Sequence, residues 1–461
     1  MRTAPHDLDV TRLLGELAAS RQLDDLDPQV IDRTKRIVLD TVGCMALGST
    51  LPPGEMIAGY VRSFGGAPEA GLAGHDVRLP APLAALANGV AAHGDELDGV
   101  HKLSAHPAAI SVAACLATSE ADAASGADLL LGITISFDIG CGLLAGFGGG
   151  LLMKRAPRHL HASSFIAVGA GAGCARIGGA SPAEIRSAMA LAATQTFVPD
   201  AFLLESTHMS KALAQGQAAA AGVSGARLAR AGCATHDAFL DAPDGLADAW
   251  WHDQADLGAG LSSAQHHAHV LDHGFKYFSA GYAVQAPIAL TLRCMADHGI
   301  SPEQLSGVRV GVTTSSAQKV DASIVQGVSL QDMLSIAIAR GGLTHEDAHD
   351  PTHASNPLIR SLRERIEVVR DQHLDEQDPR SRAAWVEVTT TDGASHRTET
   401  ELPPGHGELG GMPWEDLRAK FRGLAGGRLR PAAVDRIIDA VEHLDDLGEA
   451  TELGELLGAG A

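Results

Sequence analysis

The spacing of apolar residues predicts helices over most of the chain. Between residues 7 and 260, apolar side chains recur every three or four positions, as on a helix buried along one face. Alanine and leucine supply most of these positions, and both residues favour helices. Pro28, Pro107 and Pro182 fit the first helical position, which tolerates proline. The pattern predicts helices at 81–92, 108–121, 124–147, 182–193 and 212–230.

The pattern changes near Gly274. Residues 308–314 and 385–391 alternate between apolar and polar side chains, as half-buried strands do, and helical stretches lie between them. Helices return after residues 403–405, at 414–423 and 430–447. We therefore predict a mainly α fold with a large all-helical domain (1–268 and 405–461). A smaller α+β domain (269–404) is inserted before the C-terminal helices.

Composition narrows the class of protein. The 461 residues include 35 Lys+Arg and 56 Asp+Glu, a net charge of −21 that argues against nucleic-acid binding. We expect no membrane partner, because residues 124–147 carry acidic residues and glycines that suit a buried helix better than a span. The first residues lack a signal-peptide pattern, and the six cysteines are scattered singly, without a disulfide or zinc-ribbon spacing. A reduced, cytoplasmic protein is expected.

The segment 88–107 is the richest in chemically active side chains. Pro107 fits the first position of a helix, which places His106 at the N-cap. A helix N-terminus favours a bound carboxylate and a neutral imidazole, which can act as an acid or base near pH 7. An acidic surface loop with solvated histidines is the alternative. The polar cluster comprises His93, Asp95, Glu96, Asp98, His101, Lys102 and His106.

Metal and nucleotide sites are less well supported. His93 with Asp95, or Asp98 with His101, could ligate zinc or manganese, but the segment is not HExxH and no cysteine joins it. The glycine-rich stretch 169–173 has neither a preceding strand nor a Walker lysine, so we interpret it as helix packing. Neither a metal site nor a nucleotide site is therefore predicted from these patterns.

Three further segments contain candidate site residues. His161 precedes a helix of small residues, and Ser163 or Ser164 could cap that helix. Lys211 lies in the first turn of a helix, where its charge opposes the helix dipole and could hold an anion. Lys276 lies among three aromatic residues and could be partly buried. A surface loop end, an exposed lysine and a boundary lysine are the respective alternatives.

These segments, in this order, resemble the MmgE/PrpD family over nearly the whole chain. Each motif is weak alone, and the ordered set carries the resemblance. The matching segments are Leu39–Gly43, Asn88-Gly89, His93, Glu96–Asp98, His106-Pro107, Phe137–Ile139, His161 with Ser164, Met209–Lys211, Lys276–Phe278, Pro404-Gly405 and Lys420-Phe421.

The resemblance implies a large helical domain, a smaller α+β lid and a homodimer. It also implies chemistry without cofactor or metal on small di- and tricarboxylates. Family activities include 2-methylcitrate dehydratase, cis-aconitate decarboxylase and iminodisuccinate epimerase. Each of them moves a proton on the carbon next to a carboxylate.

Individual roles follow from the same resemblance. His106 falls on the family's catalytic histidine and Lys276 on its active-site lysine. Lys211 falls on a lysine that binds substrate carboxylate and His161 on a pocket histidine. Glu96 stands where the decarboxylases have aspartate.

Other positions depart from the family pattern. Val100 replaces a threonine of decarboxylase-like members, and Gly281 and Gln285 lie where many members have a histidine. His101 could substitute for that imidazole, while Glu96 or Asp98 would orient an imidazole or ammonium. Together with Lys211 and His161, these three residues are expected to bind the substrate.

We therefore predict a lyase that dehydrates or decarboxylates a citrate- or aconitate-like acid by general acid/base proton transfer. An epimerase or isomerase of an iminodisuccinate-like dicarboxylate is one alternative. A non-catalytic, dimeric carboxylate-binding protein is another. A small polycarboxylate and a second copy of the chain are the expected partners.

Overall fold

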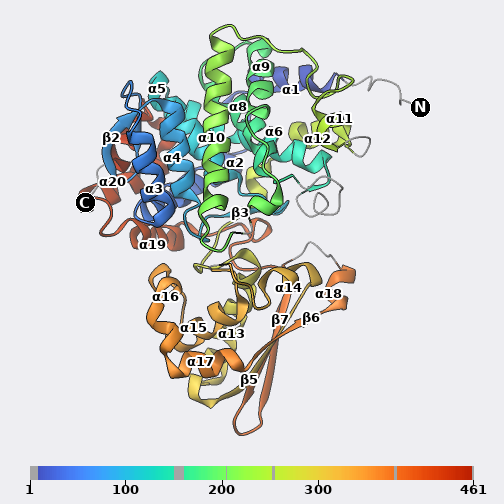
Figure 1. Cartoon of the computed structure of the whole chain (residues 1–461), viewed down its shortest axis with the longest axis vertical. Coiled ribbons are helices and arrows are strands. Elements are labelled where there is room, and N and C mark those ends of the chain that lie inside the picture. The colour runs from blue at the N-terminus through green and yellow to red at the C-terminus, as the bar shows by residue number, and fades with distance from the viewer. Residues whose placement is uncertain are drawn as a thin grey trace. The chain divides into compact units, whose positions relative to one another are not determined.

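The chain folds into two compact units. The computed structural model describes residues 9–149, 160–203, 205–251, 255–325, 327–377 and 382–458. One unit consists of residues 1–274 and 413–461, and the other of residues 275–412 (Figure 1). The first unit is built mainly of helices and the second combines helices with a sheet, so the fold is mainly α with a smaller α+β part.

The first unit is called the helical unit below; of its described α-helices, eleven precede the second unit in the sequence and three follow it. Several of them start at a proline, as predicted, because the first helical position needs no N–H donor. Its helices are α1 (Val10–Ser20), α2 (Pro28–Gly48), α3 (Pro52–Arg62), α4 (Ala81–Ala92), α5 (Pro107–Asp122), α6 (Gly126–Gly146), α8 (Ser163–Ile177), α9 (Pro182–Ala193), α10 (Met209–Arg230), α11 (Leu246–Trp251), α12 (Leu257–His266), α19 (Trp414–Ala425), α20 (Pro431–Glu442) and α21 (Thr451–Leu457).

Helix α10 lies at the centre of this unit, against α4, α5, α8 and α9 (Figure 1). Glycines permit the close contacts. A Cβ on Gly216 of α10 would lie 2.3 Å from the carbonyl oxygen of Leu86 in α4. A Cβ on Gly169 of α8 would lie 2.2 Å from the carbonyl oxygen of Ser136 in α6. The interpretation of residues 169–173 as packing glycines is therefore confirmed.

The helical unit is not entirely helical, which corrects the prediction. Strands β1 (Ala70–Leu72) and β2 (His75–Leu79) form an antiparallel hairpin. Strands β3 (Val100–His101) and β4 (His273–Gly274) pair although they lie far apart in the sequence. Both sheets are too short to give a strand periodicity that a sequence pattern could reveal.

Both unit boundaries lie later in the chain than the predicted ones at 269 and 405. The pairing of β4 with β3 keeps residues up to Gly274 in the helical unit. At the other boundary, the carbonyl of Gly405 accepts a hydrogen bond of 2.9 Å from the Phe275 amide, which joins this segment to the α+β unit.

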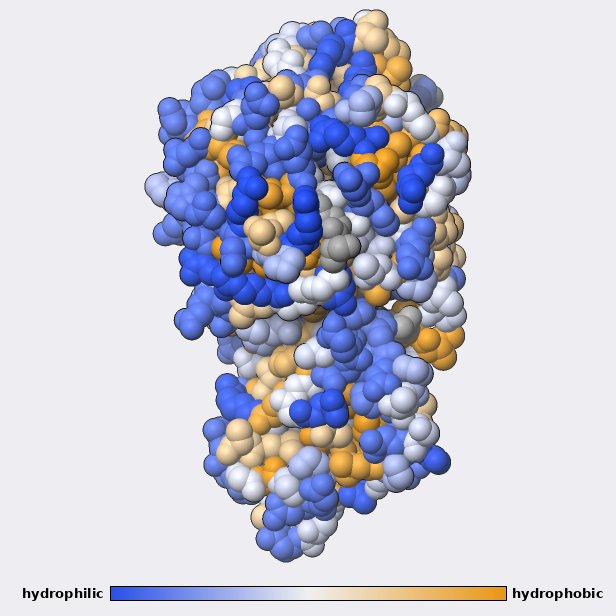
Figure 2. Space-filling view, turned by 90° about the vertical axis from the view of Figure 1, so that its left-hand side faces the viewer, coloured by the Kyte–Doolittle hydropathy of each residue, from blue (hydrophilic) through white to orange (hydrophobic). Residues whose placement is uncertain are grey.

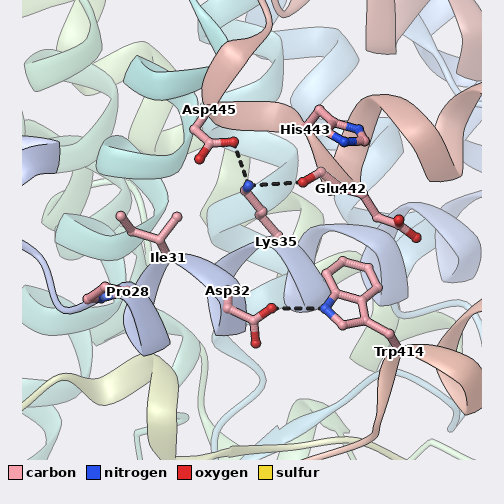
Figure 3. A pocket seen from close by; sticks show the side chains of 8 residues that line it. All are labelled: Pro28, Ile31, Asp32, Lys35, Trp414, Glu442, His443 and Asp445. Atoms are coloured by element: carbon pink, nitrogen blue, oxygen red, sulfur yellow. Dashed lines mark hydrogen bonds and ion pairs between the residues drawn. The ribbon is translucent and has the colours of Figure 1, made fainter.

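The C-terminal helices pack on the helical unit. Helices α19 and α20 both contact α2. A cavity of about 360 Å³ lies where they meet (Figure 3). Inside it, Lys35 Nζ lies 2.5 Å from Asp445 Oδ1, and the Trp414 indole donates to Asp32 Oδ1 at 2.9 Å. None of the predicted site residues lines this cavity. Its polar groups join α2 to the C-terminal segment of the helical unit.

The second unit, called the α+β unit below, is built on a four-stranded sheet. Its strands are β5 (Leu305–Val312), β6 (Ile366–Arg370), β7 (Ala384–Thr390) and β8 (Ser395–Thr400), in the order β6-β5-β7-β8. Strands β5 and β6 are parallel, and the other pairs are antiparallel. The helices are α13 (Tyr282–His298), α14 (Thr314–Val320), α15 (Leu330–Arg340), α16 (His345–His349), α17 (Pro357–Glu364) and α18 (Gln372–Gln377).

Helix α6 is long and apolar enough to span a membrane, and 94% of its apolar window is buried within the protein. It packs on α8 and α12. The outer surface is different in character: the face drawn in Figure 2 is largely hydrophilic, with smaller apolar areas. This agrees with the net charge of −21.

Candidate active site

The loop between α4 and α5 carries the predicted catalytic residue. His93 is the C-cap of α4, and His106 is the N-cap of α5, as the position of Pro107 predicted. A lysine of α19, paired with an aspartate of α2, holds this loop in position. Lys420 Nζ lies 2.6 Å from Asp40 Oδ1 and donates to the Leu97 carbonyl at 3.2 Å. The backbone next to Asp98 is therefore held in place by a buried ion pair.

The Asp98 carboxylate joins two histidines. Its Oδ1 lies 2.9 Å from His93 Nδ1, and its Oδ2 lies 2.9 Å from His106 Nδ1. Burial opposes ionisation of Asp98, yet the two imidazoles hold its pKa well below the usual value. An ionised carboxylate can only accept, so both Nδ1 atoms donate. In the neutral imidazole, Nε2 of His106 then carries the lone pair that a general base needs.

His93 is the more deeply buried of the two imidazoles. Desolvation lowers the pKa of His93 to about 3. Its ring meets the His106 ring edge to face, with centroids 4.4 Å apart. Among the described residues, no group hydrogen-bonds to its buried Nε2 atom. His93 is thus a neutral imidazole that contacts the candidate base directly.

His93, Asp98 and His106 also lie close enough together to be considered as a metal site. Ligand atoms of His93, Asp98 and His106 lie within 4.8 Å of one another. The two hydrogen bonds of 2.9 Å account for that proximity without an ion. Both histidines direct Nδ1 to the same carboxylate, which is the arrangement of an oriented acid/base pair.

Glu96 and Lys211 form a second polar group on the same side of the helical unit. The Lys211 ammonium donates to Glu96 Oε1, and His208 Nδ1 lies 3.7 Å from the same oxygen. The His208 ring is 5.1 Å from that of His93. A continuous group of polar side chains therefore extends from Asp98 and its two histidines to Lys211, the residue predicted to bind substrate.

A carboxylate of the protein, that of Glu205, caps the start of α10. Glu205 Oε2 accepts hydrogen bonds from the amides of Met209 at 2.8 Å and Ser210 at 3.1 Å. Although burial opposes ionisation, contacts with Thr207 and these amides lower the pKa of Glu205 to about 2. The carboxylate satisfies these N–H groups, so a bound anion would meet Lys211 rather than this helix end.

His161 lies just before α8. Its Nδ1 lies 2.9 Å from Ser163 Oγ and accepts from the Ser163 amide at 3.3 Å. The N-cap is Ala162 rather than either predicted serine. The role of His161 in substrate binding stays a prediction.

His101 lies in a different cluster from His106. Its Nε2 is 3.4 Å from His269 Nδ1 and 3.7 Å from Asp272 Oδ2. Burial, the neighbouring imidazoles and the Lys102 ammonium keep the pKa of His101 well below its usual value. Lys102 Nζ lies 2.8 Å from the same Asp272 oxygen. The structure therefore gives His101 buried protein partners instead of a place beside the candidate base.

The cluster around His101 also contains side chains close enough together to be considered as a metal site. His101, Cys141 and His269 offer ligand atoms within 4.8 Å of one another. However, His101 Nδ1 accepts a hydrogen bond from the Leu103 amide at 3.2 Å. A neutral His101 then carries its proton on Nε2, the atom that would have to bind the metal. A hydrogen-bonded chain of imidazoles explains the cluster better.

Lys276 lies in the α+β unit and is fully buried. The segment after it is held by Gln285, the fourth residue of α13. Gln285 Oε1 accepts from the amides of Tyr277 at 3.0 Å and Phe278 at 3.1 Å. Its Nε2 donates to the carbonyls of Phe278 and Ala280, each at 2.9 Å. Gln285 therefore uses its whole hydrogen-bonding capacity to fix this segment.

We expect Gln285→Ala to destabilise the α+β unit by about 3 kcal/mol, because four buried hydrogen bonds are lost. The stability of Gln285→His should lie between that of the wild type and that of Gln285→Ala, since a neutral imidazole offers one donor and one acceptor, whereas the glutamine amide makes four hydrogen bonds. Denaturant unfolding followed by circular dichroism measures both. Equal stability of the wild type and Gln285→Ala would contradict a structural role for Gln285.

Sequence reasoning missed several parts of this site. His208 was not among the predicted site residues, although it links His93 to Glu96. Asn88, matched as a family motif, holds the β1–β2 hairpin through bonds of 3.0 and 2.9 Å to Ala73 and Gly71. A buried polar residue in an apolar helix was the available signal for Asn88. Taken together, the described groups form an arrangement suited to general acid/base chemistry.

Comparisons with known proteins agree with this class. Residues 12–258 match the model of the MmgE/PrpD N-terminal domain, and residues 278–446 match that of the MmgE/PrpD C-terminal domain. The chain belongs to the MmgE/PrpD family.

Similar curated proteins share one activity. Human cis-aconitate decarboxylase is 26% identical over 452 residues, covering 94% of this chain and 91% of the human protein. The mouse enzyme of the same name is 26% identical over 469 residues, covering 97% and 93%. The Aspergillus terreus cis-aconitate decarboxylase is 24% identical over 480 residues, covering 97% and 96%. Family and relatives together indicate an enzyme of the lyase class.

Proposed function

We propose that the protein is a cofactor-free lyase that decarboxylates or dehydrates a small di- or tricarboxylate. The observation that carries the proposal is the Asp98–His106 hydrogen bond of 2.9 Å, which leaves the Nε2 atom of a helix N-cap histidine available for proton transfer. The cis-aconitate decarboxylases among the relatives support the choice of substrate class. Cis-aconitate itself is the first compound to test.

His106 would act on the carbon next to a carboxylate. In a decarboxylation, the carbon–carbon bond breaks, carbon dioxide leaves, and the electron pair remains on the substrate as an enolate. The protonated imidazole of His106 then gives its Nε2 proton to that carbon. In a dehydration, neutral His106 removes the carbon-bound proton, and the resulting imidazolium gives a proton to the hydroxyl group, which leaves as water. Asp98 stabilises the imidazolium in both cases.

Lys211 would bind a substrate carboxylate in competition with Glu96. Its ammonium is partly exposed, with 20% of the side-chain surface accessible, whereas Glu96 beneath it is buried. A carboxylate arriving from solvent would share the ammonium with Glu96. The roles of Lys276 as an active-site lysine and His161 as a pocket residue stay predictions.

We expect Lys211→Met to raise KM about tenfold and to lower kcat less, because a charge-assisted hydrogen bond to the substrate is lost. Glu96→Gln should lower KM, since it frees the ammonium. The double variant Glu96→Gln/Lys211→Met is the matched control, because it leaves no buried charge unpaired. Steady-state kinetics measure all three. A fall in kcat with unchanged KM in Lys211→Met would contradict carboxylate binding.

The proposed activity has a direct assay. The protein is incubated with cis-aconitate, citrate and 2-methylcitrate, and the products are identified by proton NMR. Loss of carbon dioxide or water from any of these acids supports the proposal. Inversion of a stereocentre without loss of either group would instead assign the protein to the epimerases. Saturable binding without any product would make it a binding protein.

We expect activity to survive dialysis against EDTA, because Asp98 and the two Nδ1 atoms that it holds are already engaged with one another. Elemental analysis before and after dialysis checks this result. Loss of one zinc, manganese or iron per chain together with the activity would overturn it.

We also propose a homodimer located in the cytoplasm. All six cysteines are free, which is consistent with a reducing compartment. Light scattering at micromolar concentration should give twice the chain mass of 47.6 kDa. A monomer at that concentration would remove this part of the proposal.

A further inference from the structure

We infer that His93 is a positioning residue that sets the proton affinity of His106 through the carboxylate they share. The inference rests on the proposed function of His106 as the acid/base group and adds a role for a second imidazole. It starts from one geometric fact: Asp98 Oδ1 receives His93 Nδ1 and Asp98 Oδ2 receives His106 Nδ1, both at 2.9 Å.

A shared carboxylate distributes its negative charge between its two donors. Asp98 is buried, so water does not take up the remaining charge. Each additional donor makes a carboxylate a weaker acceptor for its other partner. The N–H of His93 therefore weakens the stabilisation that Asp98 gives to the His106 imidazolium. Without that donor, His106 would hold its proton more tightly.

His93 does not transfer the proton itself. Its side chain has no exposed surface, and desolvation keeps this imidazole neutral. Its contact with His106 is the ring edge, with centroids 4.4 Å apart. The structure thus assigns His93 a fixed task, which is to donate one hydrogen bond to Asp98.

Other titratable or charged groups of the helical unit interact with the trio, and they are unchanged in the comparison proposed below. Their constancy isolates the effect of the hydrogen bond donated by His93. Lys211 of α10, His208 just before α10, His273 of β4 and Cys44 of α2 interact with members of the trio, and Asp95, Glu96, Arg33, Asp40 and Lys420 interact with those four groups in turn.

Two substitutions separate the donor from the ring. His93→Phe keeps a planar ring against His106 but removes the Nδ1 donor. His93→Asn removes the ring, but its amide nitrogen is attached to Cγ as Nδ1 is, so it can still donate to Asp98 Oδ1. If His93 acts through its donor, only the phenylalanine variant changes the proton affinity of His106. If His93 only fills space, the asparagine variant should show the larger disturbance.

The test follows the His106 imidazole by NMR of protein labelled at the histidine Cε1 carbon. The His106→Asn spectrum assigns the resonance. In His93→Phe we expect the His106 titration midpoint to lie about one pH unit higher than in the wild type, a tenfold change in proton affinity. In His93→Asn it should lie within about 0.3 of the wild type. The limb of the pH–rate profile that reports His106 should move with it in the phenylalanine variant: the acidic limb if His106 acts as the base of a dehydration, and the alkaline limb if it acts as the acid of a decarboxylation.

An unchanged midpoint in His93→Phe would overturn the inference, as would an equal upward change in both variants. If His93→Phe fails to fold, the test rests on folded His93→Asn. A displaced His106 titration midpoint in that variant would overturn the inference, and an unchanged midpoint would support it. The NMR titration needs no substrate. A protein without lyase activity would therefore refute the proposed function, while the midpoints still decide the role of His93.

Discussion

Replacing His106 by asparagine is expected to lower kcat by at least about 10²-fold, the usual contribution of one general acid/base group. The amide nitrogen of asparagine can keep the hydrogen bond to Asp98 Oδ2, which spans 2.9 Å in the wild type. The substitution therefore removes the reactive Nε2 atom and little else. Because asparagine is a favoured N-cap residue, the start of α5 should also remain intact.

The thermal midpoint of His106→Asn should accordingly stay close to that of the wild type, and steady-state kinetics give the rate. The same substitution at His443, an exposed histidine of the helical unit, is the matched control and should leave kcat unchanged. Turnover of the true substrate by His106→Asn at the wild-type rate would show that another residue transfers the proton.

Asp98→Asn is expected to lower kcat by roughly 10²–10⁴-fold while leaving KM nearly unchanged. Both oxygens of Asp98 accept hydrogen bonds in the wild type. An amide offers one acceptor and one donor, so one imidazole must face an N–H group. If that imidazole is His106, its proton moves to Nε2, which removes the lone pair that a dehydration needs. In a decarboxylation, loss of the carboxylate destabilises the imidazolium that gives the proton.

A control separates this tautomer effect from unfolding. The near-ultraviolet circular dichroism of Asp98→Asn should match that of the wild type, and the kinetics should be measured above about pH 5. There the wild-type carboxylate is ionised, because its two imidazole partners hold the pKa of Asp98 well below the usual value despite its burial. Equal kcat values for the variant and the wild type would rule out an orienting role for Asp98.

Much of the helical pattern could be predicted because strong local signals mark it. The predicted bounds 81–92 and 182–193 agree with α4 and α9. For α9, Ser181 caps the helix and Pro182 begins it. The strands β6 and β8 were missed. Strand β8 has the sequence Ser-His-Arg-Thr-Glu-Thr and lies at the sheet edge, so it lacks the apolar alternation that identifies a strand.

The candidate site was predicted only in part, for a different reason. The helix-start signal of Pro107 correctly gave the N-cap position of His106. The contact of Asp98 with His93 and His106 arises in an irregular loop, where spacing gives no geometry. The pairing of Glu96 with Lys211, 115 positions apart, depends on how α10 packs against α4. The hydrogen bonds of Gln285 depend in the same way on the folded path of residues 277–280.

The central claim is that His106 transfers a proton to or from the carbon next to a carboxylate of a small polycarboxylate. The most direct test is to incubate the protein with cis-aconitate in D₂O and to follow the product by proton NMR. The account predicts release of carbon dioxide, with one deuterium on the product carbon that receives the proton, and a rate at least about 10²-fold lower for His106→Asn. Deuterated product formed equally fast by His106→Asn and by the wild type would contradict it.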